Sequence, residues 1–141
     1  MVGLLALVVA AAFTGAAVYV SAVEQPARLA LDDRAMLAQW KPAYARGSIM
    51  QAGLALLACL LGAVAAWQSG DSRWLVGAAL SLLPWPWTLL AIMPVNRTLK
   101  AMPAAEAGPE ARTLLHRWNR LHLVRVALGL AATLAYLWML V

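Results

Sequence analysis

Four long apolar stretches divide this chain of 141 residues. Three of them, at about 1–23, 47–68 and 74–95, carry no charged side chain, and a fourth at the C-terminal end carries one arginine. Each is long enough to cross a hydrocarbon layer of about 30 Å as a helix that rises about 1.5 Å per residue. The sequence therefore predicts an all-α fold, an integral membrane four-helix bundle with helices at about 1–23, 47–68, 74–95 and 110–141.

The composition excludes a soluble globule. Hydrophobic residues make up 64% of the chain and charged residues 12%, and the mean hydropathy is +0.75. A soluble domain is roughly half apolar and about a quarter charged. The uncharged N-terminal stretch lacks the basic start of a signal peptide, so we expect it to stay as a span. We expect one domain over 1–141, and the single cysteine, Cys59, excludes a dithiol redox enzyme.

The basic residues indicate an orientation. Nine of the 11 Lys and Arg residues lie in the two longer connections, and the turn between the second and third spans contains only Arg73. The nine are Arg28, Arg34, Lys41, Arg46, Arg97, Lys100, Arg112, Arg117 and Arg120. By the positive-inside rule both longer connections are cytoplasmic and both termini are outside, as expected in a bacterial inner membrane. The net charge of +5 therefore reports topology, and no nucleic-acid partner is expected.

The first longer connection has the pattern of a short helix over about 32–44. Asp32 is a suitable N-cap, and apolar side chains recur on one face at Met36, Leu37, Trp40 and Tyr44. We expect this helix to lie on the membrane surface between the first two spans. In the third span, Pro84 and Pro86 predict a kink.

Polar residues near the spans gather on one side of the predicted bundle. An ionised side chain at membrane depth costs free energy and needs a partner or a function. With antiparallel spans, the following residues all fall in the cytoplasmic half: Glu24, Gln25, Arg46, Gln51, Thr88, Asn96, His116, Asn119, His122 and Arg125. This clustering predicts a polar pocket there.

The fourth span carries the sharpest pattern. Trp118, His122, Arg125 and Gly129 follow at intervals of four, three and four residues, which places them on one stripe of a helix. Glu24 is the acidic residue beside a span on this side, so we expect it to contact Arg125 or His122. The alternative is that Arg125 extends to the interface and His122 is an interfacial residue.

A metal centre is not expected. The only two histidines, His116 and His122, are six residues apart and point about 120° away from each other on a helix. His122 with Glu24 and Asn96 offers at most a weak, oxygen-rich site. Haem ligation has no supporting motif, so the sequence predicts neither a metal nor an organic cofactor.

Two segments carry a resemblance to a known family. They are PWTLLAIMPVNRTL at 86–99 and LLHRWNRLHLVR at 114–125, with a weaker third match in EQPAR at 24–28. Together they resemble the anthrone oxygenase-like membrane family across essentially the whole chain. The family pattern falls on Thr88, Pro94, Asn96, Trp118, His122 and Arg125. The resemblance implies four membrane helices and, for some members, oxidation of an anthrone to an anthraquinone by molecular oxygen without a conventional organic cofactor.

Such chemistry requires a base, a cation beside the oxyanion and an apolar slot. Under this resemblance, His122 is the candidate base, oriented by Glu24, and Arg125 holds the oxyanion with Asn96. The remaining candidates for substrate contact are Trp118, Asn119, Thr88, Trp87 and Gln51. Whether the chain is an enzyme stays open at this point, and so does the identity of a hydrophobic aromatic or polyketide-type substrate.

Two other classes of function fit the same pattern. One is a non-enzymatic protein that binds or transports a lipid or a small hydrophobic ligand, and the other is a glutathione-transferase-like membrane enzyme. In each case the expected partners are membrane lipids and a hydrophobic small molecule. A homo-oligomer is compatible with the small residues Gly53 and Gly62 on the second span.

Overall fold

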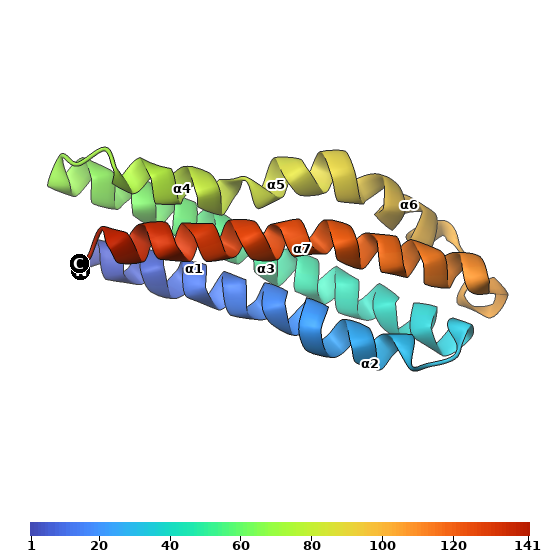
Figure 1. Ribbon diagram of the computed structural model, residues 1–141. Coiled ribbons are helices and arrows are strands. Elements are labelled where there is room, and N and C mark those ends of the chain that lie inside the picture. The colour runs from blue at the N-terminus through green and yellow to red at the C-terminus, as the bar shows by residue number, and fades with distance from the viewer.

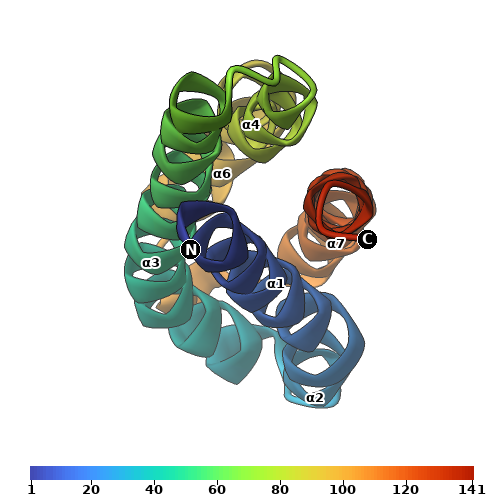
Figure 2. The same cartoon turned by 90° about the vertical axis from the view of Figure 1, so that its left-hand side faces the viewer.

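The computed structural model describes all 141 residues and contains helices and short connections only (Figure 1). Four helical segments are long and apolar enough to cross a membrane: Val2–Leu29, Asp33–Ser69, Trp74–Ala101 and Pro109–Trp138. They run antiparallel, and each packs against the spans before and after it, with the fourth closing on the first. Figure 2 shows this arrangement along the bundle. The all-α four-helix fold is confirmed.

Two of the four spans consist of several helical pieces. The first span contains α1 (Val2–Tyr19), the π-helical turn η1 (Val20–Glu24) and α2 (Gln25–Leu29). The third contains α4 (Trp74–Leu82), α5 (Pro84–Trp87), the π-helical turn η2 (Thr88–Ile92) and α6 (Met93–Ala101). The second and fourth are the single helices α3 (Asp33–Ser69) and α7 (Pro109–Trp138), and the short 3-10 helix η3 (Ala104–Glu106) precedes α7.

The two ends of the bundle differ. One end holds both termini and the turn at 70–73, and we call it the terminal end. The other holds the connections at 30–32 and 102–108, with most of the basic residues nearby, and we call it the basic end. In the turn at the terminal end, Arg73 donates hydrogen bonds to Asp71 and holds the pKa of that carboxyl below its usual value.

The separate surface helix expected at about 32–44 does not exist. Asp32 caps a helix as expected, since its side chain accepts a hydrogen bond from the Ala35 N–H at 2.9 Å, but that helix is α3, which continues for 37 residues. Met36, Leu37 and Trp40 are fully buried in the bundle core together with Leu99. An amphipathic face fits a bundle core as well as a membrane surface, which is why the pattern alone misassigned this helix.

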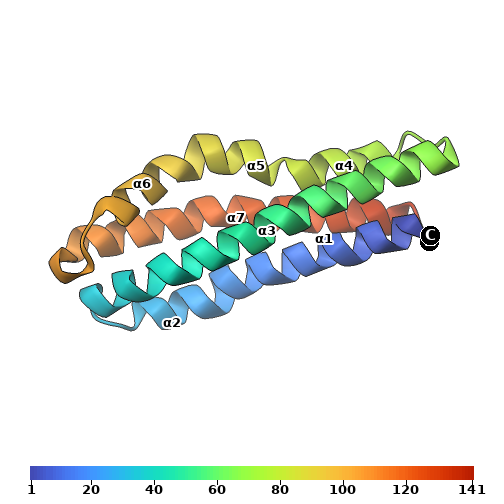
Figure 3. The same ribbon diagram turned by 180° about the vertical axis from the view of Figure 1, so that it is seen from behind.

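The third span is interrupted where its prolines lie. The helix α4 ends at Leu82, and α5 begins with Pro84. In Figures 1 and 3 the region of α5 bows outward before α6 returns toward the bundle. The helix then continues beyond the expected end at 95, as far as Ala101, so Asn96 lies within a helical turn.

Each π-helical turn ends two residues before a proline. The Gln25 N–H bonds the Val20 carbonyl and Pro26 follows, and the Met93 N–H bonds the Thr88 carbonyl before Pro94. A proline ring crowds the carbonyl four residues earlier in an α-helix, and a wider turn relieves that contact. The two turns face the same region of the bundle, and each supplies a residue of the site described below.

Candidate functional site

The stripe predicted on the fourth span faces the interior of the bundle. Trp118, His122 and Arg125 are 5%, 3% and 8% exposed. A Cβ placed on Gly129 would lie 2.8 Å from the Thr14 side chain, so this glycine allows α1 and α7 to approach closely. The alternative in which Arg125 and His122 reach the interface is wrong, because both are enclosed by the bundle.

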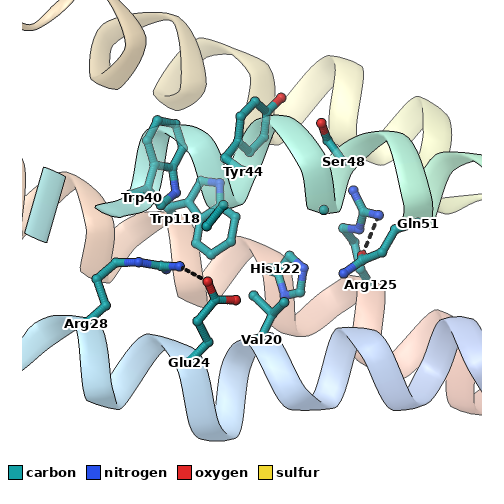
Figure 4. Close-up of a pocket in the computed structure, with 12 residues that line it drawn as sticks. Val20, Glu24, Arg28, Trp40, Tyr44, Ser48, Gln51, Trp118, His122 and Arg125 are labelled. Carbon is teal, nitrogen blue, oxygen red and sulfur yellow. Dashed lines mark hydrogen bonds and ion pairs between the residues drawn. The ribbon is translucent and has the colours of Figure 1, made fainter. Parts of the chain in front are cut away.

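A small cavity of about 40 Å³ lies beside this stripe, and we call it the first cavity. Figure 4 shows side chains from α3, α7 and the first span converging on it. It is lined by Val20, Glu24, Arg28, Trp40, Ala43, Tyr44, Gly47, Ser48, Gln51, Trp118, His122 and Arg125. Of the polar residues expected on this side of the bundle, Glu24, Gln51, His122 and Arg125 line this cavity.

Aromatic rings form one wall of the first cavity. The Trp118 ring stacks on the His122 imidazole with a centroid distance of 4.9 Å and an interplanar angle of 21°. Trp40 meets Trp118 edge to face at 6.1 Å, and Tyr44 stacks on Trp40 at 4.9 Å. Such pairs hold rings in fixed planes, so the imidazole has little freedom to turn.

Ser21 is the hydrogen-bond partner of His122. Its Oγ lies 2.9 Å from the imidazole Nδ1, and Ser21 belongs to the π-helical turn η1. The other ring nitrogen, Nε2, has no hydrogen-bond partner in the protein. When Nδ1–H donates to Ser21, Nε2 carries the lone pair and can accept a proton from a molecule in the cavity.

The expected contact of Glu24 with His122 or Arg125 is wrong. The Glu24 carboxylate accepts a hydrogen bond from Arg28 at 2.7 Å, one turn along the same span, and another from Gln39 at 3.1 Å. Arg28 also donates to Gln39 and to Gln25 and is 3% exposed. A cation one turn away on the same helix meets the carboxylate with little rearrangement, whereas Arg125 lies on another span.

Arg125 is buried without a carboxylate. Its two terminal nitrogens donate to Thr88 Oγ1 at 2.9 Å and to Gln51 Oε1 at 2.8 Å, and its guanidinium lies 5.6 Å from the centre of the Phe13 ring. The Nε–H has no partner. An ionised guanidinium that is compensated only by neutral groups is an attractive site for a developing negative charge.

The remaining predicted substrate contacts divide into two groups. Gln51 and Trp118 line the first cavity, and Thr88 lines a second cavity that also reaches Arg125. Asn96, Trp87 and Asn119 line neither cavity.

Asn96 and Trp87 serve packing rather than the cavity surface. Asn96 is fully buried, accepts a hydrogen bond from Trp118 Nε1 at 2.9 Å and donates to the Tyr44 hydroxyl at 3.0 Å. It therefore fixes two rings of the aromatic wall. The Trp87 indole donates to the Leu121 carbonyl at 2.9 Å, which ties the third span to α7.

Several residues at the site were not assigned to it from the sequence, among them Ser21, Trp40 and Tyr44. Trp40 and Tyr44 belonged to the expected surface helix, so their place in α3 was missed. A serine in an apolar helix often bonds its own backbone, so its presence does not indicate a contact with another span. The residues next to Ser21 in the sequence give no further signal. The signal available for it was Pro26, which marks the wider turn that contains Ser21.

Metal-ligating side chains do not gather in this fold. No group of three or more His, Cys, Asp or Glu residues stands close enough to hold one ion, and His116 is exposed on the outer side of α7. The polar groups that line the first cavity are an imidazole, two guanidinium groups, a carboxylate, an amide and hydroxyl groups.

The fold and the site together define a class: four helices long and apolar enough to cross a membrane, with a buried imidazole and guanidinium beside an aromatic wall. A family model described as anthrone oxygenase matches residues 40–135. An anthrone oxygenase from Claviceps purpurea (strain 20.1) is 30% identical in an alignment 135 positions long, which covers 86% of this chain and 78% of that protein. The chain therefore belongs to the anthrone oxygenase family.

The matched segment contains most of the site. His122, Arg125, Trp118 and Asn96 lie within 40–135, whereas Ser21 of the first span lies before it. No solved structure matches the chain. Family membership supports an oxygenase-like function. The roles of individual residues are argued below from their contacts and burial.

Proposed function

We propose that this chain is a membrane-embedded oxygenase that oxidises a planar, hydrophobic anthrone-type substrate with molecular oxygen. The observation that carries the proposal is the pair formed by Arg125 and His122. Arg125 is buried without a carboxylate, and one turn away His122 presents an Nε2 with no partner in the protein. A base beside an uncompensated cation suits a reaction that starts by forming an enolate.

The first step of the proposed reaction is proton transfer. The methylene group of an anthrone lies opposite a ketone and between two aromatic rings, which makes its C–H bonds acidic. His122 Nε2 accepts one of these protons, and the negative charge moves to the ketone oxygen, where Arg125 stabilises it. Ser21 and Trp118 hold the imidazole in the required plane and tautomer.

The second step is oxygen transfer to the same carbon. The enolate gives an electron to oxygen, and the two radicals combine to form a carbon–oxygen bond and a peroxide. Loss of the remaining C–H proton with cleavage of the O–O bond then gives the quinone carbonyl. One oxygen atom enters the product, the other leaves as water with the two hydrogens of the methylene group, and the substrate supplies all the electrons. The proposal therefore requires no organic cofactor and no metal.

The orientation in the membrane is part of this proposal. The positive-inside rule places the basic end, and with it the first cavity, on the cytoplasmic side of a bacterial inner membrane. Both termini and the turn at 70–73 then face outward. The surrounding lipids are partners in this arrangement, because leucines such as Leu4, Leu89 and Leu130 are at least half exposed along the spans.

Replacement of His122 tests the proposal directly. In purified protein in lipid nanodiscs, His122→Ala should lower oxygen consumption with an anthrone by about 100-fold or more, the usual range for losing a general base. The rate in empty nanodiscs is subtracted, since anthrones oxidise slowly on their own. His116→Ala is the matched control on the same helix and should leave the rate unchanged, because His116 is exposed and outside the cavity. An unchanged rate in His122→Ala would show that His122 is not the base.

A binding protein for hydrophobic anions is the second candidate function. The buried Arg125 without a carboxylate favours it as much as it favours catalysis. The same measurement separates the two functions. A binding protein gives no oxygen uptake above the empty-nanodisc rate, yet a planar acid still raises its thermal stability by mass action.

A further inference from the structure

A second cavity of about 280 Å³ opens between α3 and the bowed part of the third span. Its lining combines residues of α3, α5, η2 and the start of α6 with Arg125 from the middle of α7: Tyr44, Ser48, Ile49, Ala52, Pro84, Trp85, Thr88, Leu89, Met93 and Arg125. In Figure 3 the third span stands away from α3 in this region. The interruption at Pro84 and the turn η2 thus separate the two spans at the level of Arg125.

The two cavities differ in volume, so they suit molecules of different size. The first, of about 40 Å³, holds little more than one water, whose share of liquid volume is about 30 Å³. The second, of about 280 Å³, is close to the lower end of the range of ligand pockets, roughly 300–1,000 Å³. The second cavity is therefore the larger space for a ring system, while the first has room for a molecule the size of water or dioxygen.

Arg125 lies at the boundary between the cavities and lines both. One terminal nitrogen bonds Thr88, which lines the second cavity, and the other bonds Gln51, which lines the first. The Nε–H is buried without a partner. Tyr44 and Ser48 line both cavities as well, so the boundary between the two spaces is formed by Arg125, Tyr44 and Ser48.

The rim of the second cavity faces hydrocarbon. Ile49 and Leu89 are 76% and 58% exposed, and both lie within segments apolar enough to span a membrane. Trp85 also lines this cavity, and its indole nitrogen donates to the Ala52 carbonyl at 3.2 Å. A ligand dissolved in the bilayer can reach Arg125 by this route without passing through water.

We propose that the second cavity receives a planar, hydrophobic weak acid from the bilayer, with its rings against Trp85 and Leu89 and its acidic oxygen on Arg125. The neutral acid partitions into hydrocarbon, and the guanidinium favours the anion once the ligand is bound. The identification of the natural ligand as the substrate rests on the proposed function. The substrate of the proposed reaction then lies in the second cavity with its oxygen on Arg125, and the first cavity beside His122 has room for oxygen.

Filling each cavity separately tests the proposal. The probe is anthracene-9-carboxylic acid, titrated by its fluorescence against the protein in nanodiscs. Ala52→Phe adds a ring inside the second cavity and should weaken binding by about tenfold or more. Gly53→Phe is the matched control, because Gly53 is the next residue, lines neither cavity and has open space where a Cβ would lie. It should bind the probe as the unmodified chain does.

The charge at Arg125 is tested with a pair of ligands. Arg125→Gln should weaken binding of the acid by about tenfold or more, since a buried charge pair loses one partner. Binding of the uncharged 9-methylanthracene should change little. Gly47→Leu places a side chain in the first cavity, where a Cβ meets nothing within 4 Å, and should leave the affinity for the acid unchanged while lowering oxygen uptake.

Two results would overturn the inference. One is binding to Ala52→Phe, and to the smaller change Ala52→Leu, that equals binding to the unmodified chain. The other is loss of binding in Gly47→Leu with retention in Ala52→Phe, which places the ring in the first cavity. Failure of the proposed function is distinguishable, because it removes oxygen uptake from every variant and leaves the pattern of probe affinities intact.

Discussion

Ser21 and Glu24 occupy one π-helical turn, yet only Ser21 contacts the imidazole of His122. Glu24 is satisfied by Arg28, and the carboxylate that the sequence pairs with His122 is therefore engaged elsewhere. Glu24 and Arg28 line the first cavity as an ion pair, whereas Arg125 donates only to neutral groups. Under the proposed function, Arg125 is therefore the cation available to stabilise the substrate oxygen.

Loss of the Ser21 hydroxyl should slow the reaction through the orientation of His122. We expect Ser21→Ala to lower kcat about fivefold, which corresponds to one hydrogen bond of about 1 kcal/mol, with little change in KM. Ser21→Thr keeps an Oγ at the same position and should recover most of the rate. Oxygen uptake at varied anthrone concentrations separates the two parameters. A rise in KM with constant kcat, or no recovery in Ser21→Thr, would argue that the serine only packs.

At the level of single residues, the sequence predicted the buried stripe but not its partners. The spacing of Trp118, His122 and Arg125 follows from helix geometry and needs no tertiary information. Partners depend on which side chains on other spans come closest, and one competing local contact, Arg28 with Glu24, was enough to change the outcome. Asn96 was expected at the oxyanion and instead supports Trp118 and Tyr44.

Among the elements, the two π-helical turns connect proline positions to the site. Each turn precedes a proline by the same offset, and they contribute Ser21 and Thr88, which bond His122 and Arg125. The spacing of apolar residues does not reveal such turns, because a periodicity analysis assumes the same number of residues per turn throughout a span. The prolines themselves were visible, whereas the direction in which the third span bows follows from packing against α3 and α7.

Removal of Pro94 should disturb the site more than the fold. Pro94→Ala restores a backbone N–H that can bond the Leu90 carbonyl, so η2 can close to an α-helical turn. The side chain of Thr88 then rotates away from Arg125, and we expect the affinity for the planar acid to fall about tenfold or more, the effect of one lost hydrogen bond to a charged group. Titration in nanodiscs measures the affinity, and thermal unfolding should show an unchanged or higher midpoint.

The control for this change is Pro103→Ala, which lies in the connection outside the third span. It should affect neither the affinity nor the unfolding midpoint. If Pro94→Ala binds the acid as tightly as the unmodified chain, the π-helical turn does not position Thr88 for Arg125. A large fall in the unfolding midpoint would instead assign Pro94 to the stability of the fold.

For the whole molecule, the four spans and their antiparallel order could be predicted because apolar length is a strong constraint in a membrane. The start of α7 was predicted at about 110 and lies at Pro109. The extents of α3 and α6 at the basic end could not be predicted, since both continue past the apolar residues and pack against α7 through Leu37, Leu99 and Leu115. The volume of the second cavity depends on how far the third span bows from α3. The hydrophobic periodicity of the sequence does not give that separation.

Orientation is the property of the whole molecule that can be tested without a substrate. In a Cys59→Ala background, one cysteine is introduced at the exposed Ser72 in the turn of the terminal end and another, in a separate variant, at the exposed Ala105 of the basic end. In intact bacterial cells a membrane-impermeant maleimide should label Ser72→Cys at once and Ala105→Cys only after lysis. The reverse pattern would place the basic end outside the cell. Because His122 lies in the half of the bundle toward that end, the same pattern would also reverse the side from which protons reach the first cavity.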